Sequence, residues 1–266
     1  MAIKSIENVK PLMLDAGGMA LEAQRNLRFA DRDTKEDGSI VTEADRRVEE
    51  FLFERISALY PEANVLTEET ARDFDPAKPY TFAVDPIDGT DVFSLGMGGW
   101  SVSVGLFDDT MTPIAGVIVA PRLDLQIFAD VGEPVELNGK AIAMPGIVQP
   151  LSERSNVMTT SRIHHEIDLS GYPGKLRSIG SAALHLSFPI IHPGVFAALE
   201  GSAGHIWDIA GAHAVNCSLG LDFVTLSGGR VDYAGMIGGE VVGEPILAGP
   251  RDNVDALRRV LVDASI

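Results

Sequence analysis

The first sixty residues carry apolar positions at helical spacing in two stretches. Over residues 8–29 the apolar residues recur every three or four positions, which predicts a helix. Asn8 is its expected N-cap, so that Pro11 lies in the first turn, where a missing N–H group is harmless. Thr42 opens a second pattern of the same period, which predicts a helix over residues 42–59.

Short apolar runs bounded by turn residues follow these helices and predict strands. They lie at residues 64–66, 81–84, 101–107, 114–119 and 125–129. Only turn formers separate the last three runs, which predicts an antiparallel meander, and Asn138-Gly139 predicts a hairpin turn. Proline, glycine and polar residues over 143–154 predict a joint between two lobes.

Strand and helix patterns alternate beyond this joint. Strands are predicted at residues 156–159, 195–199 and 222–226, and helices at 181–188, 208–219 and 252–263. Helices first, then a meander, then alternating elements favour an α/β protein of layered sheets over a doubly wound parallel fold. We expect one domain over residues 1–266, with sub-lobes at about 1–145 and about 150–266.

Three carboxylates stand within seven residues in the segment Asp85-Pro86-Ile87-Asp88-Gly89-Thr90-Asp91. Pro86 biases Asp85 toward extended backbone, and Gly89 allows the chain to approach a ligand closely. Converging carboxylates repel one another unless a divalent cation neutralises them, so the pattern predicts a site for a hard metal ion. A surface turn is the alternative, because Asp, Pro and Gly are also turn formers. The spacing does not fit an EF-hand loop.

Four other segments accompany this one along the chain. They are Leu66-Thr67-Glu68-Glu69-Thr70, residues 35–45 (KEDGSIVTEAD), residues 177–183 (RSIGSAA) and residues 206–211 (IWDIAG). In type and order, the five segments resemble the motifs of the inositol monophosphatase family of magnesium-dependent, lithium-sensitive phosphatases. The resemblance implies a layered α-β-α-β-α sandwich of the inositol monophosphatase and fructose-1,6-bisphosphatase type, a homodimer, and two or three Mg²⁺ ions.

The resemblance also implies a role for each matching residue. The metal ligands would be the carboxylates of Glu68, Asp85, Asp88 and Asp208 and the backbone carbonyl of Ile87. The catalytic residues would be Glu68 and the pair Thr90 and Asp45, which help to activate the metal-bound water. The substrate would contact Gly89, Thr90, Gly180, Ser181, Ala182 and Glu200.

Some of these assignments compete with simpler roles. Thr42-Glu43-Ala44-Asp45 also fits a capping box at a helix start. Glu69 either orients the metal ligands or is a solvated neighbour, and Trp207 either braces the Asp208 loop by packing or stacks on the substrate. Glu200 is one residue out of register with the family's hydroxyl-binding glutamate.

Composition restricts the partners and the compartment. The net charge of −17, from 21 basic and 38 acidic residues, argues against binding to nucleic-acid polymers. No apolar run has the length to cross a bilayer and no signal-peptide pattern begins the chain, so we expect no membrane partner. The single cysteine, Cys217, fits a reducing cytoplasm, and its helical spacing predicts a buried packing thiol. The six histidines lack the spacing of a zinc set, and no P-loop string is present.

Together these features predict a Mg²⁺-dependent phosphomonoesterase that acts on a small polyol or sugar phosphate through a metal-activated water. The residues after Gly89-Thr90 are Asp91-Val92-Phe93, where inositol monophosphatases carry Thr-Asn-Phe and the nucleotide-cleaving relatives carry Lys-Glu-Phe. A 3′(2′),5′-bisphosphate nucleotidase, a histidinol-phosphatase and a fructose-1,6-bisphosphatase therefore stay open as alternatives. A non-catalytic regulator that binds metal or phosphate is a further alternative.

Overall fold

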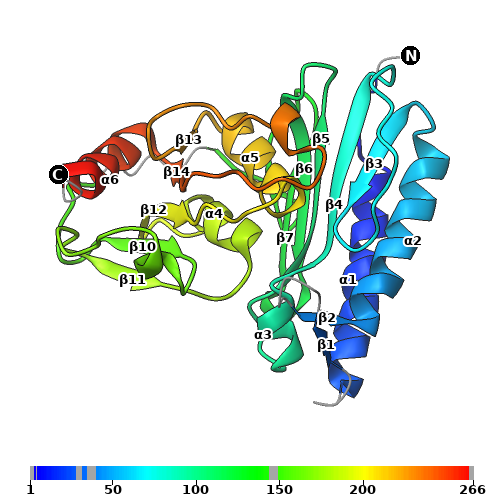
Figure 1. Cartoon of the computed structure of the whole chain (residues 1–266), viewed down its shortest axis with the longest axis horizontal. Coiled ribbons are helices and arrows are strands. Elements are labelled where there is room, and N and C mark those ends of the chain that lie inside the picture. The colour runs from blue at the N-terminus through cyan, green and yellow to red at the C-terminus, as the bar shows by residue number, and fades with distance from the viewer. Residues whose placement is uncertain (1–2, 4, 28–31, 35–39, 144–148, 264–266) are drawn as a thin grey trace.

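The helices and sheets form five layers in a computed structural model that describes residues 3, 5–27, 32–34, 40–143 and 149–263. In Figure 1 the layers run from α6, through a five-stranded sheet, to α4 and α5, then to a seven-stranded sheet, and last to α1 and α2. The order is the α-β-α-β-α arrangement that was expected. No helix in the described part of the chain is long and apolar enough to cross a bilayer.

The seven-stranded sheet has its strands in chain order. These are β3 (Ala63–Thr67), β4 (Tyr80–Asp88), β5 (Ser101–Phe107), β6 (Pro113–Ala120), β7 (Leu125–Ala129), β8 (Glu136–Leu137) and β9 (Lys140–Ala141). β3 and β4 are parallel, and the remaining pairs are antiparallel, which confirms the predicted meander. The hairpin turn between β8 and β9 is also confirmed, with positive φ at Asn138 (51°) and Gly139 (71°).

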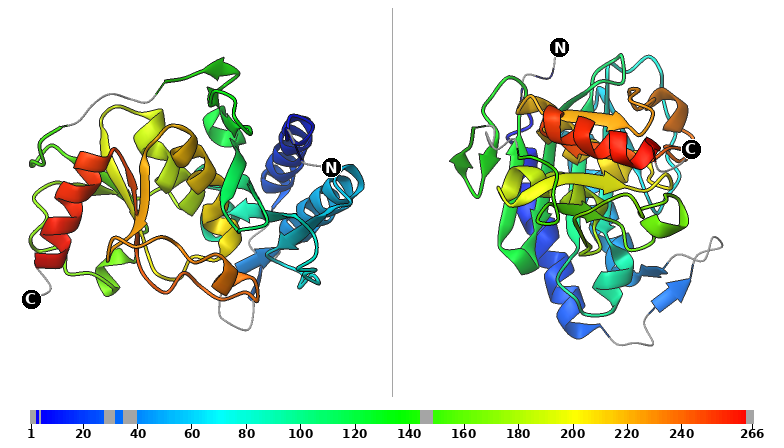
Figure 2. Two further views of the ribbon diagram at one scale, coloured as in Figure 1. Left: turned by 90° about the horizontal axis from the view of Figure 1, so that it is seen from above. Right: turned by 90° about the vertical axis from the view of Figure 1, so that its left-hand side faces the viewer.

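The outer face of this sheet is covered by α1 (Val9–Asn26) and α2 (Glu43–Leu59), which lie side by side in the left view of Figure 2. Two short strands, β1 (Arg32–Thr34) and β2 (Ile40–Thr42), lie between these helices along the chain and pair with each other in antiparallel fashion. Asn8 is the N-cap residue of α1, as predicted, although its side chain makes no capping bond. The predicted end of the helix is wrong, because Leu27 is already extended at ψ 132° and the helix ends at Asn26.

The middle layer consists of α4 (Ala182–Ile191) and α5 (Ile206–Ser218). α5 lies against β5 and β6 at two sheet glycines. A Cβ atom on Gly105 would be 2.4 Å from Cβ of Ala210, and one on Gly116 would be 2.5 Å from the carbonyl oxygen of Gly211. Small residues on both sides therefore allow the close approach that brings the start of α5 to the end of β4.

The five-stranded sheet has the order β11-β10-β12-β14-β13. Its strands are β10 (Asn156–Thr159), β11 (Lys175–Arg177), β12 (Val195–Glu200), β13 (Asp222–Thr225) and β14 (Ile246–Gly249), and α6 (Arg251–Asp263) crosses its outer face in the right view of Figure 2. The sequence pattern missed β11, whose three residues are all exposed, and β14. It also placed the start of α5 two residues late.

Two other expectations meet the structure here. Cys217 is exposed in the last turn of α5, so the prediction of a buried packing thiol is wrong. Its neighbour Ser218 is exposed as well, because the packed face of α5 ends before this turn. The expected joint over residues 143–154 includes 144–148, which lie outside the described residues.

Candidate active site at the end of β4

Asp85 and Asp88 stand at the carboxyl end of β4, where the strand leaves its regular pairing with β5. The register shifts between these two residues, and the N–H of Ile87 donates to Oδ1 of Asp85 at 3.0 Å. The side chains of Asp85 and Asp88 are 1% and 5% exposed. Gly89 then takes φ 92°, and the five-residue helix α3 (Thr90–Ser94) begins. The sharp change of direction places both carboxylates beside the strand end.

Two further carboxylates reach the same place from other elements. Glu68 follows β3, which runs parallel to β4 with Thr67 opposite Val84, so their carboxyl ends lie side by side. Asp208 is in the first turn of α5, where its Oδ2 accepts the N–H of His205 at 2.6 Å. The start of α5 is therefore directed at the end of β4.

The electrostatics show how closely these groups converge. Burial raises the pKa of Asp85 well above its ordinary value, and the charges of Glu68, Asp88 and Asp208 raise it further. Burial raises the pKa of Asp208 in the same way, with Glu68 and Asp88 adding to the effect. Burial also raises the pKa of Asp88 to about 6, against the opposing hydrogen bonds from Ser181 and Ala183. Ionising all of these groups together requires a compensating positive charge.

The donor set fits a hard divalent cation in its chemistry. Asp85 and Asp208 lie within hydrogen-bonding distance of each other, which two ionised carboxylates tolerate only with a proton or cation between them. All the available donors are oxygens, which Mg²⁺ prefers. In the ranges that the structure describes, no three His, Cys, Asp or Glu side chains are already arranged around one point as a metal site. The carboxylates are engaged with protein groups instead.

Asp45 caps α2 and also contacts Thr90, one partner on each carboxylate oxygen. Its Oδ2 accepts the N–H of Thr42 at 2.8 Å and the Thr42 hydroxyl at 2.6 Å, which completes a capping box at the start of α2. Its Oδ1 accepts the hydroxyl of Thr90 at 3.2 Å. Burial raises the pKa of Asp45 to about 6, although the hydrogen bonds from Thr42 lower it. The Thr90 hydroxyl also lies 3.0 Å from the carbonyl oxygen of Ile87.

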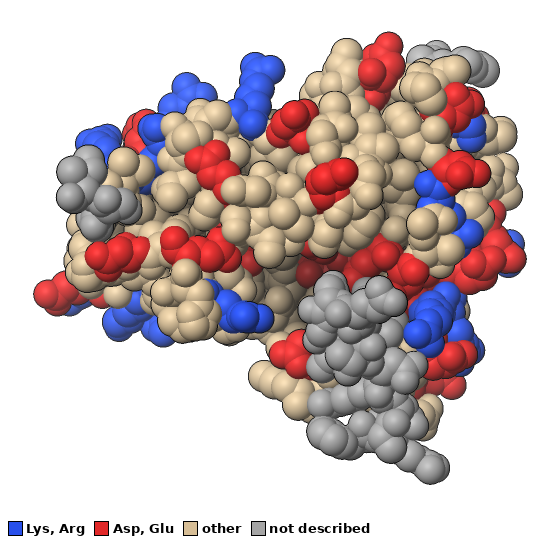
Figure 3. Space-filling model, in the orientation of Figure 1, with Lys and Arg blue, Asp and Glu red and all other residues tan. Residues whose placement is uncertain are grey.

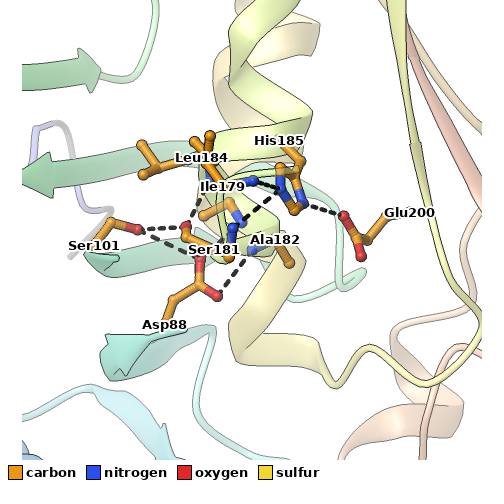
Figure 4. Close-up of polar contacts among 10 residues, drawn as sticks. Asp88, Ser101, Ile179, Ser181, Ala182, Leu184, His185 and Glu200 are labelled. Atoms are coloured by element: carbon orange, nitrogen blue, oxygen red, sulfur yellow. Dashed lines mark hydrogen bonds and ion pairs between the residues drawn. The ribbon is translucent and has the colours of Figure 1, made fainter. Parts of the chain in front are cut away.

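The start of α4 surrounds Asp88 with donors (Figure 4). The N–H of Ala182 donates to Oδ1 at 3.0 Å, and the N–H of Ala183 donates to Oδ2 at 2.8 Å. The hydroxyl of Ser181, the N-cap of α4, also donates to Oδ2. Asp88 thus belongs to one sheet but stabilises the first turn of a helix in the middle layer.

A pocket of about 500 Å³ opens beside these carboxylates. Asp88, Gly180, Ala182, Glu200 and Asp208 line it, together with Thr160, Arg162, His165, Glu166, Gly201, Ala203 and Gly204. The first five had been predicted as site residues. Ser181 had been predicted as well, but its side chain is fully buried and bonded to Asp88, so it stands behind the pocket wall.

Arg162, His165 and Glu166 were missed by the sequence reasoning. They lie in and beside the 3-10 turn η3 (Ile163–His165) after β10. Nothing in the spacing of these residues marks them, because tertiary contacts bring them to the pocket, such as the bond from the N–H of Ser202, after β12, to Oε2 of Glu166 at 2.7 Å. Figure 3 shows acidic side chains in the hollow at the centre of this face.

Trp207 and Glu69 have different surroundings. Trp207 packs against the larger core cluster and stacks on His205 with ring centroids 5.1 Å apart. It is not among the pocket residues, which favours the bracing role over stacking on substrate. The N–H of Glu69 donates to the buried Oε2 of Glu49 at 2.6 Å, so Glu49 holds the segment that carries Glu68.

Comparison with known proteins identifies the family. The family model described as inositol monophosphatase family matches residues 6–254, which is nearly the whole chain. The chain belongs to the inositol monophosphatase family. It is therefore a phosphatase, a phosphoric monoester hydrolase, of a metal-dependent family.

Individual relatives agree with this placement. The chain is 28% identical over 237 residues to the 3′(2′),5′-bisphosphate nucleotidase CysQ of Shigella flexneri, covering 86% of this chain and 93% of that protein. It is 30% identical over 189 residues to inositol monophosphatase 1 of Solanum lycopersicum, covering 66% and 68% of the two chains. An IMPase of Thermotoga maritima has the same fold, with a TM-score of 0.82 at 19% identity over 98% of this chain and 97% of that one. These matches confirm the predicted fold class.

Proposed function

We propose that the chain is a Mg²⁺-dependent phosphomonoesterase that hydrolyses a small polyol or sugar phosphate with a metal-activated water. The observation that carries this proposal is the convergence of Glu68, Asp85, Asp88 and Asp208 beside a pocket that Asp88 and Asp208 line. The pKa values of Asp85, Asp88 and Asp208 are raised, because these carboxylates are buried and, for Asp85 and Asp208, because other negative charges lie close by. A phosphate ester enters such a site only when cations reverse the local field.

Glu68, Asp85, Asp88, Asp208 and the carbonyl of Ile87 would hold two or three Mg²⁺ ions. When bound, magnesium supplies a water of lowered pKa and neutralises charge on the phosphoryl oxygens. Asp45 accepts the hydrogen of the Thr90 hydroxyl, which leaves a lone pair of that oxygen available to accept a hydrogen from the attacking water. The raised pKa of Asp45, about 6, lies close to neutral pH, so its carboxylate is suited to accept a proton during the reaction.

The remaining predicted residues would orient the ester. The backbone at Gly89 and Thr90 would face the phosphate at the start of α3. Gly180 and Ala182 form the pocket wall beside Asp88, and Glu200 lines the pocket at the end of β12. We assign the alcohol part of the substrate to this pocket, whose volume of about 500 Å³ is sufficient for a sugar or a polyol ring.

A second candidate is a nucleoside bisphosphate, the substrate class named for the CysQ relative. Arg162 and His165 favour it, because they bring hydrogen-bond donors to a pocket whose other ionisable side chains are all carboxylates, namely Asp88, Glu166, Glu200 and Asp208. An arginine guanidinium binds a phosphate with two parallel hydrogen bonds, so Arg162 would hold a second phosphate group.

Phosphate release from a panel of esters tests the proposal. The panel contains inositol monophosphates, sugar monophosphates, fructose 1,6-bisphosphate, histidinol phosphate and 3′-phosphoadenosine 5′-phosphate, each with Mg²⁺ and with chelator. We expect Mg²⁺-dependent turnover of at least one ester, and its loss in Asp85→Asn. Turnover of none would favour the non-catalytic regulator, and turnover in chelator would exclude the metal mechanism.

Arg162→Gln separates the two substrate classes. For the bisphosphates we expect KM to rise about tenfold or more, because a charged hydrogen bond is lost, with little change for the monophosphates. Arg154→Gln, an exposed arginine outside the pocket, is the matched control. An equal change in KM for bisphosphates and monophosphates would leave the monophosphate as the preferred substrate. We further propose a cytoplasmic homodimer, for which light scattering tests the assembly.

A further inference from the structure

His185 has a buried position that the proposed reaction does not itself require. It lies in the first turns of α4, 1% exposed, and its ring returns toward the segment before the helix (Figure 4). Its Nε2 accepts the N–H groups of Ile179 at 3.0 Å and Gly180 at 3.3 Å. Because Nε2 is the acceptor, Nδ1 carries the ring hydrogen and donates it to Oε2 of Glu200 at 2.8 Å.

The segment held by the ring leads directly to the donors around Asp88. Gly180 is followed by Ser181, whose hydroxyl donates to Asp88, and then by the N–H groups of Ala182 and Ala183. All three donors depend on the same turn of backbone. A group that fixes the turn therefore also fixes the position of the Asp88 carboxylate.

The other side of the ring holds Glu200, the last residue of β12 and a wall residue of the pocket. His185 engages Oε2, and Figure 4 shows the second oxygen of Glu200 directed away from the ring. Glu200 is 7% exposed, so its carboxylate has little room to change orientation. The hydrogen bond from the ring thus fixes the orientation of the Glu200 carboxylate at the pocket wall.

We propose that His185 is a positioning residue that sets Glu200 and the Ile179–Ala182 turn together, and so joins the substrate-alcohol pocket to Asp88. Its kinetic consequences rest on the proposed phosphatase reaction, whereas its geometry does not. His185 is not among the pocket residues, so it acts on substrate only through these two groups. Holding both in one arrangement before binding reduces the ordering that the substrate must otherwise impose.

The ring tautomer tests the geometry without any turnover. In the full-length, metal-free protein labelled with ¹⁵N-histidine, we expect His185 to show a protonated Nδ1 and an Nε2 with the shift of a hydrogen-bond acceptor. His185→Gln identifies its signal by removing it. A protonated Nε2 would overturn the proposal. This result stands even if no ester in the panel is hydrolysed.

Two substitutions separate the two halves of the proposal kinetically. The amide nitrogen of an asparagine lies near the position of Nδ1, so His185→Asn keeps the donor to Glu200 and loses the acceptor for the turn. The amide oxygen of a glutamine reaches the position of Nε2, so His185→Gln keeps an acceptor for the turn and loses the donor to Glu200.

With the ester of highest turnover, we expect His185→Asn to lower kcat about tenfold at nearly unchanged KM, and His185→Gln to raise KM about tenfold at nearly unchanged kcat. Adding Glu200→Gln to His185→Gln should raise KM little further, because both remove one interaction. His213→Gln, at a partly buried histidine bonded to Tyr233 away from the site, is the control for loss of packing alone. Equal changes of kcat and KM in the two His185 variants would refute the positioning role.

Discussion

The charge of Asp45 should cost the metal-free protein stability at neutral pH, and Asp45→Asn should remove that cost. Burial raises the pKa of Asp45 from its ordinary value of 3.8 to about 6. Between these values the unfolded chain has lost the proton while the folded chain still holds it, so stability falls as pH rises through this window. A change of about two pH units corresponds to about 3 kcal/mol.

The asparagine variant isolates this effect. Its amide oxygen still accepts one bond from Thr42, and any loss at the other contacts is the same at every pH. The free energy of unfolding of Asp45→Asn, relative to wild type, should therefore rise by about 3 kcal/mol between about pH 4 and about pH 7 and stay level above it. For a chain of this length we expect a relative gain in Tm of about 6 °C or more.

Thermal unfolding from pH 4 to pH 8 in chelator is the assay, with Asp15→Asn on the exposed face of α1 as the control for loss of one charge. Turnover with Mg²⁺ is measured on the same samples. We expect Asp45→Asn to lose turnover while it gains relative stability, because Thr90 loses its carboxylate partner. A stability difference that does not change between pH 4 and pH 7 would refute the raised pKa. Full activity in the variant would confine Asp45 to helix capping.

The other predictions address the metal, the water, lithium and the packing. Asp85→Asn should raise Tm in chelator, because one repelling carboxylate is lost. It should also abolish the further rise in Tm that Mg²⁺ produces in wild type, and a variant that still responds to Mg²⁺ like wild type would contradict this. Thr90→Ala and Asp45→Asn should each reduce turnover, and the double variant should be scarcely slower than either, whereas additive losses would mean that they act separately. Lithium should inhibit turnover relative to a matched potassium control, since the site holds excess negative charge, and indifference to lithium would argue for an altered metal position. Gly105→Ala should lower the free energy of unfolding by about 3 kcal/mol in urea titrations, because the new Cβ would be 2.4 Å from Cβ of Ala210; an unchanged midpoint would show that α5 can move away.

The sequence alone determined the order of elements and the identity of the clustered carboxylates. The two leading helices, the meander and the hairpin at Asn138-Gly139 follow from local periodicity and turn chemistry, which act within a few residues. β11 and β14 escaped this reasoning, because a short exposed strand and a short strand late in the chain carry weak periodic signals. Cys217 has helical spacing but lies past the packed face of α5. The spacing of apolar residues predicts a helix, but it does not show at which turn the helix stops packing against the core.

Only the tertiary structure decided how the site is assembled. Ser181 and Asp88 are 93 residues apart in the chain, and the first turn of α4 meets the end of β4 because two sheets pack on one helical layer. The same packing turns His185 back to the Ile179–Gly180 turn and sets Arg162 at the pocket. Asp45 appeared in the sequence as either a helix cap or a partner of Thr90, and the structure shows both, one on each carboxylate oxygen. Residue types determine which groups are able to bond, but a carboxylate's partners depend on burial and direction, which arise only when distant segments pack together.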